Sequence, residues 1–265
     1  MFVLIRGAGD LASGVALRLW HSGFDVVMTD LEHPTCIRRT VSFAEAVING
    51  RTDVEDVSAQ KAENTTHMKE LLKRNILPVF VDPECRCISE LKPDILVDAI
   101  LAKQNLGTKI TDAPIVIGVG PGFEAGVNCH AVVETMRGHT LGRVIYDGSA
   151  LSNTNIPGRI GGFAGERVLR APADGVFRGT HQIGDEVAAG DIVGYVGDKP
   201  MICTIGGVLR GLLADGTKTR EGMKAGDVDP RGKREYCDTV SDKALSVAGG
   251  VLEAILHLYT VKGDF

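Results

Sequence analysis

The chain has 265 residues and a mass of 28.2 kDa, which exceeds one ordinary domain of about 100–150 residues and predicts two. With 44% hydrophobic and 24% charged residues, it has the composition of a globular protein and not of a disordered one. A net charge of -5 and 5% aromatic residues argue against a nucleic-acid-binding surface. No uninterrupted apolar run reaches the about 18–20 residues of a membrane span, and no secretory signal is recognisable, so we expect a cytoplasmic protein.

The first part of the chain predicts an α/β fold. Phe2 to Ile5 and Phe24 to Met28 have the pattern of short buried strands, and Leu11 to Trp20 between them has that of a helix. This βαβ opening predicts a Rossmann-like, mainly parallel sheet in an α/β domain over residues 1–160. Further strands are expected at 78–81, 95–97 and 115–119, and a helix at 67–74.

Glycine is distributed unevenly: six glycines lie in residues 1–117, and the other 27 of the 33 lie in the last 148. This second part contains a repeat, because Gly175–Gly179 recurs at Gly207–Gly211, an offset of 32. The same offset pairs Gly184 with Gly216, Gly190 with Gly222 and Gly194 with Gly226. Two such β units cannot each bury a face alone, so they should pair about a pseudo-twofold axis. Their spacing resembles the biotinyl/lipoyl barrel-sandwich fold, which we expect over residues 161–232.

The last segment, 233–265, predicts one helix. Ser241 is a credible N-cap, followed by Asp242 in the first turn. We expect the helix to pack on the α/β domain, with Gly249 and Gly250 allowing a close approach; packing on the β domain is the alternative. The apolar stripe at helical spacing consists of Ala244, Val247, Ala248, Val251, Leu252, Ile255 and Leu258.

A glycine loop follows the first strand and opens the first helix. Gly7, Gly9 and Ala12 form the G-x-G-x-x-A pattern in which main-chain N–H groups approach a pyrophosphate at a helix N-terminus. Asp30, at the end of the second strand, stands where an acidic residue accepts the ribose hydroxyls. Asp10 argues the other way, because its carboxylate would lie near the phosphates. A helix cap at Asp10 and a purely structural turn form the alternative interpretation.

A second glycine loop, with Gly120 and Gly122, follows the strand at 115–119 and could face the same crevice, since ligands of open α/β sheets bind beyond the carboxyl ends of strands. Polar residues near it and a pair of arginines are candidates for anion binding, acid–base chemistry or metal binding, although each could equally be a solvated surface residue. These candidates are Asp98, Lys103, Asp112, Arg38 and Arg39.

The remaining polar motifs are weak signals. The six cysteines do not form a disulfide framework and are expected to be thiols; Cys85 and Cys87 are too close in sequence for an ordinary zinc knuckle, although they could handle sulfur or selenium. His130, Glu134 and His139 could converge on a metal, but residues 127–133 alternate like a strand, so we expect no metal site. Lys199 lies on the hairpin that carries the modified lysine in lipoyl domains.

Taken together, these residues resemble the YqeB family, accessory proteins of the selenium-dependent molybdenum hydroxylase system. The resemblance implies maturation of such a hydroxylase, with its apoenzyme as a partner and a nucleotide or molybdopterin-type cofactor as ligand; whether the chain is an enzyme, or a homo-oligomer, stays open. The alternatives are an NAD(P)-dependent oxidoreductase acting on a small anionic substrate and a lipoyl-like carrier. The segments that carry the resemblance are Ile5–Gly14, Ile37–Phe43, Val97–Lys103, Asn105–Thr108, Gly120–Phe123, Glu134–His139 and Leu209–Leu212.

Overall fold

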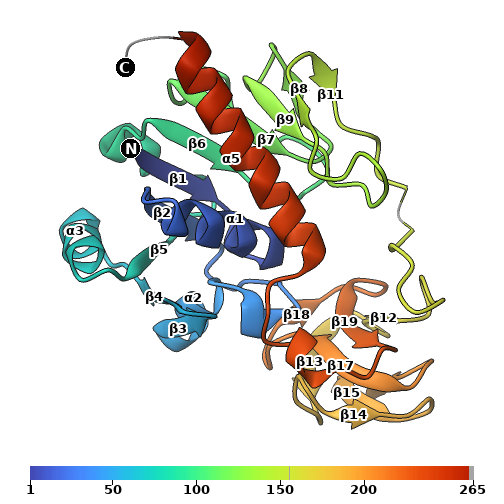
Figure 1. Cartoon of the computed structure of the whole chain (residues 1–265). Helices are drawn as coiled ribbons and strands as arrows, with labels where there is room; N and C mark the ends of the chain where they lie inside the picture. Colours follow the sequence, from blue (N-terminus) through green and yellow to red (C-terminus); the bar gives the residue numbers. More distant parts are fainter. Residues whose placement is uncertain (155, 263–265) are drawn as a thin grey trace. The chain divides into compact units, whose positions relative to one another are not determined.

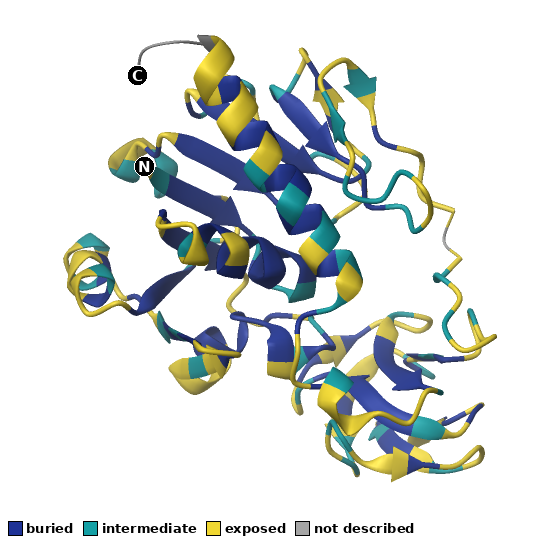
Figure 2. Cartoon of the chain, viewed as in Figure 1, coloured by how far each residue is buried: buried dark blue, intermediate teal, exposed yellow. Residues whose placement is uncertain are grey.

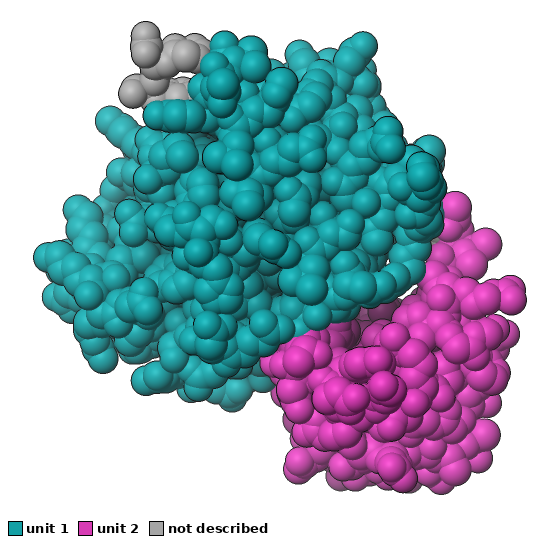
Figure 3. Space-filling model, in the orientation of Figure 1, with its two compact units in different colours: residues 1–34, 43–153, 240–265 teal, residues 35–42, 154–239 magenta. Residues whose placement is uncertain are grey.

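The structure is a computed structural model that describes residues 1–154 and 156–262. It divides into two compact units, coloured separately in Figure 3. Unit 1 comprises Met1–Pro34, Phe43–Asn153 and the chain from Val240 onward, whereas unit 2 comprises Thr35–Ser42 and Thr154–Thr239. The β unit therefore includes a short segment from the front part of the chain, and the C-terminal segment belongs to the α/β unit.

Unit 1 is built on a nine-stranded sheet of order β10-β9-β7-β6-β1-β2-β5-β4-β3 (Figure 1). The seven strands from β9 to β4 are parallel, and only β10 and β3, at the two edges, run antiparallel to their neighbours. The prediction of an α/β fold with a mainly parallel sheet is confirmed. The strands are β1 (Phe2–Arg6), β2 (Asp25–Asp30), β3 (Arg51–Val54), β4 (Val57–Lys61), β5 (Leu77–Val81), β6 (Ile95–Asp98), β7 (Ile115–Val119), β9 (Ala131–Val133) and β10 (Val144–Ile145).

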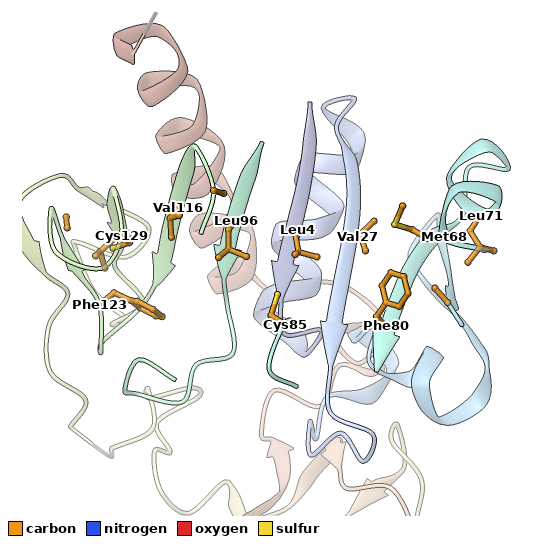
Figure 4. Packing of buried hydrophobic residues seen from close by; sticks show 14 of the residues in the cluster. Leu4, Val27, Met68, Leu71, Phe80, Cys85, Leu96, Val116, Phe123 and Cys129 are labelled. Carbon is orange, nitrogen blue, oxygen red and sulfur yellow. The ribbon is translucent and has the colours of Figure 1, made fainter. Parts of the chain in front are cut away.

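The central strands are buried on both faces, which is why they read as near-continuous apolar runs (Figure 2). On one face, Leu4, Val27 and Leu96 of three adjacent strands line up in one apolar layer (Figure 4). Met68 and Leu71 close this layer at one side of the sheet. The helices of unit 1 are α1 (Asp10–His21), α2 (Glu45–Asn49), α3 (Thr65–Lys73), α4 (Ile88–Leu91) and α5 (Asp242–Lys262).

Several strand boundaries differ from the sequence prediction by one residue, and two differ by more. β2 runs two residues further than expected, to Asp30, because its pairing with β5 continues to the register of Asp30 with Val81. The alternating segment 127–133 is a strand only at Ala131–Val133. Its first residues form a turn, in which Val127 N–H donates to the Glu124 carbonyl and the Val127 side chain is 62% exposed. Val127 thus fits the alternating pattern of a strand, although it lies exposed in a turn.

Unit 2 contains two four-stranded antiparallel sheets, of order β12-β19-β17-β14 and β16-β15-β13-β18. β13, β14 and β15 begin 32 residues before β17, β18 and β19 (175 to 207, 186 to 218 and 192 to 224). Replacing each strand of one sheet by its repeat equivalent gives the order of the other sheet, so the sequence repeat is a pseudo-twofold repeat of structure. The strands are β12 (Val168–Arg170), β13 (Gly175–Gly179), β14 (Glu186–Val187), β15 (Ile192–Val196), β16 (Lys199–Ile202), β17 (Gly207–Leu212), β18 (Lys218–Thr219) and β19 (Lys224–Asp229).

One half of the repeat carries a buried charge network that the other lacks. Arg210 of β17 donates to Asp227 at 2.6 Å and contacts Asp229 at 3.1 Å, and Arg167 also bonds to Asp227. The equivalent residue in β13, Arg178, is exposed. Burial raises the pKa of Asp229, but the hydrogen bonds from Arg231 and the charge of Arg210 outweigh this and leave the pKa below its ordinary value. The Asp229 carboxylate thus stays ionised, and its contact with Arg210 joins β19 to β17.

Helix α5 begins as predicted, with Ser241 Oγ accepting the Ala244 N–H, and packs alongside α1 in unit 1 (Figure 1). A Cβ at Gly14 of α1 would lie 2.7 Å from the Ala244 Cβ, so this glycine permits the close approach. In length and composition α5 could cross a membrane, yet such a helix is weak evidence of a span. Its packed face is dark blue in Figure 2, as in a core helix.

Gly249 and Gly250 differ in their surroundings, although both were expected to allow close packing. A Cβ at Gly250 would overlap the carbonyl oxygen of Gly142 and lie 2.8 Å from Val133, whereas a Cβ at Gly249 would meet no atom within 4 Å. Only Gly250 therefore faces the sheet. The expectation for Gly249 is wrong because a helix turns by 100° per residue, which carries its neighbour to the outer face.

This contrast predicts opposite effects of the same substitution at neighbouring positions. Gly250→Ala should destabilise the chain by about 1–3 kcal/mol, because the methyl group overpacks the contact with Gly142. Gly249→Ala should stabilise it by about 0.4–1 kcal/mol, since alanine restricts the unfolded chain at no steric cost. Urea unfolding of both variants measures the difference, and a lower stability of Gly249→Ala would contradict the orientation of α5.

Candidate functional site

The chain direction reverses between β1 and β6, which are adjacent at the centre of the sheet. From β1 the chain continues to β2 and β5 on one side, and from β6 to β7 and β9 on the other. At such a switch point the loops after the two strands separate, and ligands of open α/β sheets bind there beyond the carboxyl ends. The loops that follow β1, β5, β6 and β7 start at this edge, beside Asp30 at the end of β2, and form the candidate site.

The two glycines of the loop after β1 differ in backbone conformation. Gly7 has a φ of +99°, which favours glycine, and a Cβ there would lie 3.0 Å from the Ala99 carbonyl oxygen. Gly9, by contrast, has φ -73° and ψ -176°, a conformation open to any residue. Gly7 is thus explained by its own backbone and by the approach of the loop after β6. Gly9 therefore supplies no positive φ to the turn.

Helix α1 starts without a side-chain cap. Its N-cap residue is Gly9, and Asp10 is the first helical residue instead of the cap. The first-turn N–H groups of a helix have no partner inside it, and together with the helix dipole they favour an anion at this end. Leu11 and Ala12, the next residues of this turn, are buried. The loop therefore has the local geometry of an anion site, with the Asp10 carboxylate on the same turn.

Asp30 lies at the end of β2, where an acidic residue was predicted, and is bonded to the loop itself. Its Oδ2 accepts the Ala8 N–H at 2.7 Å, and its Oδ1 accepts the Leu31 N–H at 2.7 Å. Burial raises the pKa of the Asp30 carboxyl, while the Leu31 and Ala8 hydrogen bonds lower it in part. The Ala8 carbonyl in turn accepts the Ala44 N–H at 2.9 Å. Asp30 thus fixes the path of the glycine loop as well as facing the site.

A buried ionic network joins the ends of β1 and β6. Arg6 donates to Asp98 Oδ2 at 3.3 Å and to Thr108 Oγ1 at 3.0 Å, and Thr108 donates to the same Asp98 oxygen at 2.6 Å. The second guanidinium nitrogen of Arg6 donates to the carbonyls of Pro83 and Leu106. Arg6, Asp98 and Thr108 are all less than 7% exposed. One guanidinium therefore anchors the loops after β5 and β6 at the switch point.

The second glycine loop packs against the loop after β6. A Cβ at Gly122 would lie 2.6 Å from the Gln104 Cα, and one at Gly120 would lie 2.8 Å from the Thr135 hydroxyl. Both glycines have positive φ, +82° at Gly120 and +107° at Gly122. Backbone conformation and close packing thus account for both residues, and their predicted role in cofactor binding has no independent support from the geometry.

The other candidates are dispersed. Lys103 has a φ of +65° and is exposed in the loop after β6, and the half-buried Asp112 accepts the Lys109 N–H at 2.8 Å. Arg38 and Arg39 belong to unit 2. Arg38 donates to the carbonyls of Tyr236 and Thr239, and Arg39 to that of Leu212. These arginines stabilise main-chain segments of unit 2.

The potential metal ligands do not converge. Glu134 accepts main-chain N–H groups with both oxygens, from Thr135 and Leu151 among others, and His130 Nδ1 accepts the Val116 N–H. Within the described ranges, 1–154 and 156–262, no group of three or more His, Cys, Asp or Glu side chains is arranged to hold a metal. Lys199 is exposed at the first position of β16, opposite Val196 in the hairpin.

Arg6 and Asp82 were not identified from the sequence as residues at the carboxyl ends of the parallel strands, where the candidate site lies. Asp82, directly after β5, accepts the Cys87 N–H at 2.8 Å, and its own N–H donates to the Asp30 carbonyl at 3.0 Å. A signal for Arg6 was present, because a charged residue at the end of an otherwise apolar central strand needs a buried partner. Its partner Asp98 occupies the same place on the adjacent strand.

The chain is similar in sequence to a longer bacterial protein. It is 52% identical over 256 residues to the "Uncharacterized protein YqeB" of Escherichia coli (strain K12). The match covers 97% of this chain and 47% of YqeB, so the chain spans about half the length of that relative. No family model matches the chain.

Similarity to solved structures is weak. The ectoine utilization protein EutE (DoeB) from Ruegeria pomeroyi has a TM-score of 0.26 and 13% identity, over 86% of this chain and 84% of its own. A succinylglutamate desuccinylase/aspartoacylase from Rhodobacter sphaeroides has a TM-score of 0.28 and 14% identity, over 86% and 85%. TM-scores this low carry no information on activity.

The Arg6 network predicts a large cost for removing its carboxylate. Asp98→Ala should destabilise unit 1 by about 3–5 kcal/mol, because it leaves the Arg6 charge buried without its counter-ion. Thr108→Val removes only the hydroxyl and should cost about 1–3 kcal/mol. Lys109→Ala, at an exposed position in the same region, is the control and should cost less than about 1 kcal/mol. Similar denaturation midpoints for all three variants would rule out the network as the anchor of these loops.

Proposed function

We propose that this chain is an accessory factor in the maturation of a selenium-dependent molybdenum hydroxylase of the xanthine dehydrogenase type. In this proposal, unit 1 binds a nucleotide or another phosphate-containing cofactor, such as a molybdopterin nucleotide, and the hydroxylase apoenzyme is its partner. The observation that supports binding of a phosphate group is the start of α1, which has no side-chain cap. It lies directly after β1, at the switch point of the sheet. The 52% identity to YqeB supports the family that the sequence motifs resemble.

In this proposal, each part of the site has a separate role in binding. The first-turn N–H groups of α1 would hold a phosphate next to Gly9, which carries no side chain. Asp30, at the end of β2, keeps the loop in place through Ala8 and has further acceptor capacity for a hydroxyl group. Arg6 and Asp98 keep the loops after β5 and β6 in fixed positions beside the site.

The finer fold assignments belong to the same proposal. The order β5-β2-β1-β6-β7-β9 is that of a Rossmann-like sheet, strands 3-2-1-4-5-6 in the usual numbering. In unit 2, the two sheets related by the 32-residue repeat support a barrel-sandwich module of the biotinyl/lipoyl type. We assign no carrier role to Lys199, because an exposed hairpin lysine alone does not distinguish a modified residue from a surface one.

The proposed role is tested in a host that makes a selenium-dependent hydroxylase. Deleting the gene for this protein should leave the hydroxylase polypeptide at its normal level but reduce its activity and selenium content by more than tenfold. Complementation with the wild-type gene is the control. Unchanged activity and selenium content in the deletion strain would overturn the maturation role and leave only the ligand site to be explained.

The same geometry also favours one alternative, an NAD(P)-linked oxidoreductase, since Asp30 stands where such enzymes bind the ribose. Calorimetry with NAD(H), NADP(H), ATP and molybdopterin nucleotides separates the two functions. Tight binding of a nicotinamide nucleotide together with turnover of a small substrate would favour the oxidoreductase. Binding of a pterin nucleotide or ATP alone would favour the accessory factor.

Gly9 gives the sharpest test of the phosphate site. Gly9→Ala should weaken binding of the ligand found by calorimetry by more than tenfold, or about 1.4 kcal/mol, because a Cβ would enter the ligand's space. Its stability should change little, since a φ of -73° suits alanine. Gly7→Ala is the matched control and should lower the thermal midpoint, because its φ is +99° and Ala99 is close. If Gly9→Ala binds the ligand normally, the loop is only a structural turn.

A further inference from the structure

The strand β10 lies at one edge of the nine-stranded sheet and is paired on one side only, with β9. The Glu134 N–H donates to the Arg143 carbonyl at 3.0 Å across this pair. Main-chain groups along a strand point alternately to its two sides, so those of the next residue, Val144, point away from β9. Val133 stands opposite Val144, and its carbonyl accepts the Gly120 N–H at 2.9 Å instead of a bond from β10. The outer side of β10 therefore has a main-chain donor and acceptor that no strand of the described chain pairs.

The surface around this edge is open. Val144 and Ile145 are half-buried, in contrast to the residues of β6 and β7, which are all buried, and Tyr146 is 38% exposed. An open hollow of about 520 Å³ lies beside the strand, lined by Arg143 and Val144 and, from α5, by Glu253 among others. A strand edge with unpaired main-chain groups is a template for pairing with another strand. The edge of β10 thus has both the free groups and the access that such pairing requires.

Two exposed and opposite charges flank the centre of this edge. Arg143 directly precedes β10 and Asp147 follows it, so that each lies two positions from Ile145. Among residues 1–154 and 156–262, neither side chain forms an ion pair. When two such segments pair antiparallel about Ile145, Arg143 of each copy lies opposite Asp147 of the other. Opposite charges at facing positions stabilise an antiparallel strand pair, and like charges destabilise it. The edge is therefore complementary in charge to itself.

The same register also pairs the free main-chain groups. Val144 then stands opposite Tyr146 of the second copy, and both positions have the alternation that points away from β9. Ile145, at the centre, stands opposite Val132 of its own sheet and directs its main-chain groups there. Each copy thus keeps its own sheet intact while its outer groups bond to the other copy. The hydrogen-bonding pattern and the charge pattern therefore agree on one register.

Helix α5 extends the surface beside this edge. A short strand alone buries too little for a stable dimer, which needs about 800 Å² from each copy. The helix runs next to β10, because Gly250 meets the Gly142 carbonyl and the His257 ring lies 4.5 Å from the Tyr146 ring, between centroids. Its 21 residues span about 31 Å. Exposed segments recur along α5 in Figure 2, and its exposed apolar side chains include Leu245, Leu256 and Tyr259.

We propose that two copies of this chain associate through the outer edge of β10, as an antiparallel strand pair centred on Ile145, with α5 of each copy beside it. The partner is a second copy because one twofold rotation satisfies both charges and both sets of main-chain groups, as in other contacts between identical patches. The proposal concerns the surface of unit 1 and does not depend on the ligand site or on the maturation role.

Sedimentation equilibrium of the full chain over a wide range of concentration tests the association. We expect a mass of twice 28.2 kDa, with dissociation into single copies on dilution. High salt should favour dissociation, because it screens exposed charges. A mass of one copy at every concentration would overturn the proposal, and the edge would then belong to another occupant, such as the part of the longer relative that lies outside this chain.

Charge reversal tests the register. Arg143→Glu and Asp147→Arg should each weaken the dimer by at least tenfold, or about 1.4 kcal/mol, because each places like charges opposite one another at two symmetric positions. The double variant restores opposite charges and should recover the dissociation constant of the wild-type chain. Lys69→Glu reverses an exposed charge on α3 and is the control, which should leave the dimer unchanged. A dimer that resists both single reversals, or that the double variant does not restore, would overturn the proposal.

Discussion

A single buried guanidinium sets the arrangement of the candidate site. Arg6 is the last residue of β1, and its Asp98 partner is the last residue of the adjacent β6, at the place where the sheet reverses direction. A buried charge is tolerated only when it is paired and hydrogen-bonded, so the loops after β5 and β6 must bring the Pro83 and Leu106 carbonyls to it. The glycine loop, the loop with Lys103 and the turn with Cys85 therefore start from positions that this one side chain fixes.

Unit 2 shows how a duplicated β unit acquires asymmetry. Three strand pairs of its repeat keep the spacing of 32 residues, because turn position decides whether two such halves can cover each other. Side chains that do not affect the positions of strands and turns can differ between the two halves. Arg178 is exposed, whereas Arg210, 32 residues later, is buried against Asp227 and Asp229. The charges give the second half a polar centre that the first half lacks.

Local patterns were enough to predict the central elements of unit 1, but not its short elements such as β3, β4, α2 and α4, and not the partners of the polar residues. The strands around Leu4 and Leu96, helix α1, and the cap at Ser241 follow from apolar periodicity and capping preferences. The bond from Arg38 to the Tyr236 carbonyl joins residues 198 positions apart, and no local pattern contains it. The same holds for Arg6 with Asp98, 92 positions apart. The partners of these candidate residues are therefore set by tertiary contacts, and the periodicity of the sequence does not encode such contacts.

Glycine residues in a loop have several physical causes, and only one of them concerns a ligand. Gly7, Gly120 and Gly122 have positive φ, and the main chain or a side chain of another loop occupies the space beside each of them. A sequence fingerprint counts these glycines equally with Gly9. The backbone conformation of Gly9, however, is open to any residue. Gly9 is the one glycine of these four that the backbone conformation does not require, and it lies next to the first-turn amides of α1. The assignment of a phosphate site therefore rests on Gly9.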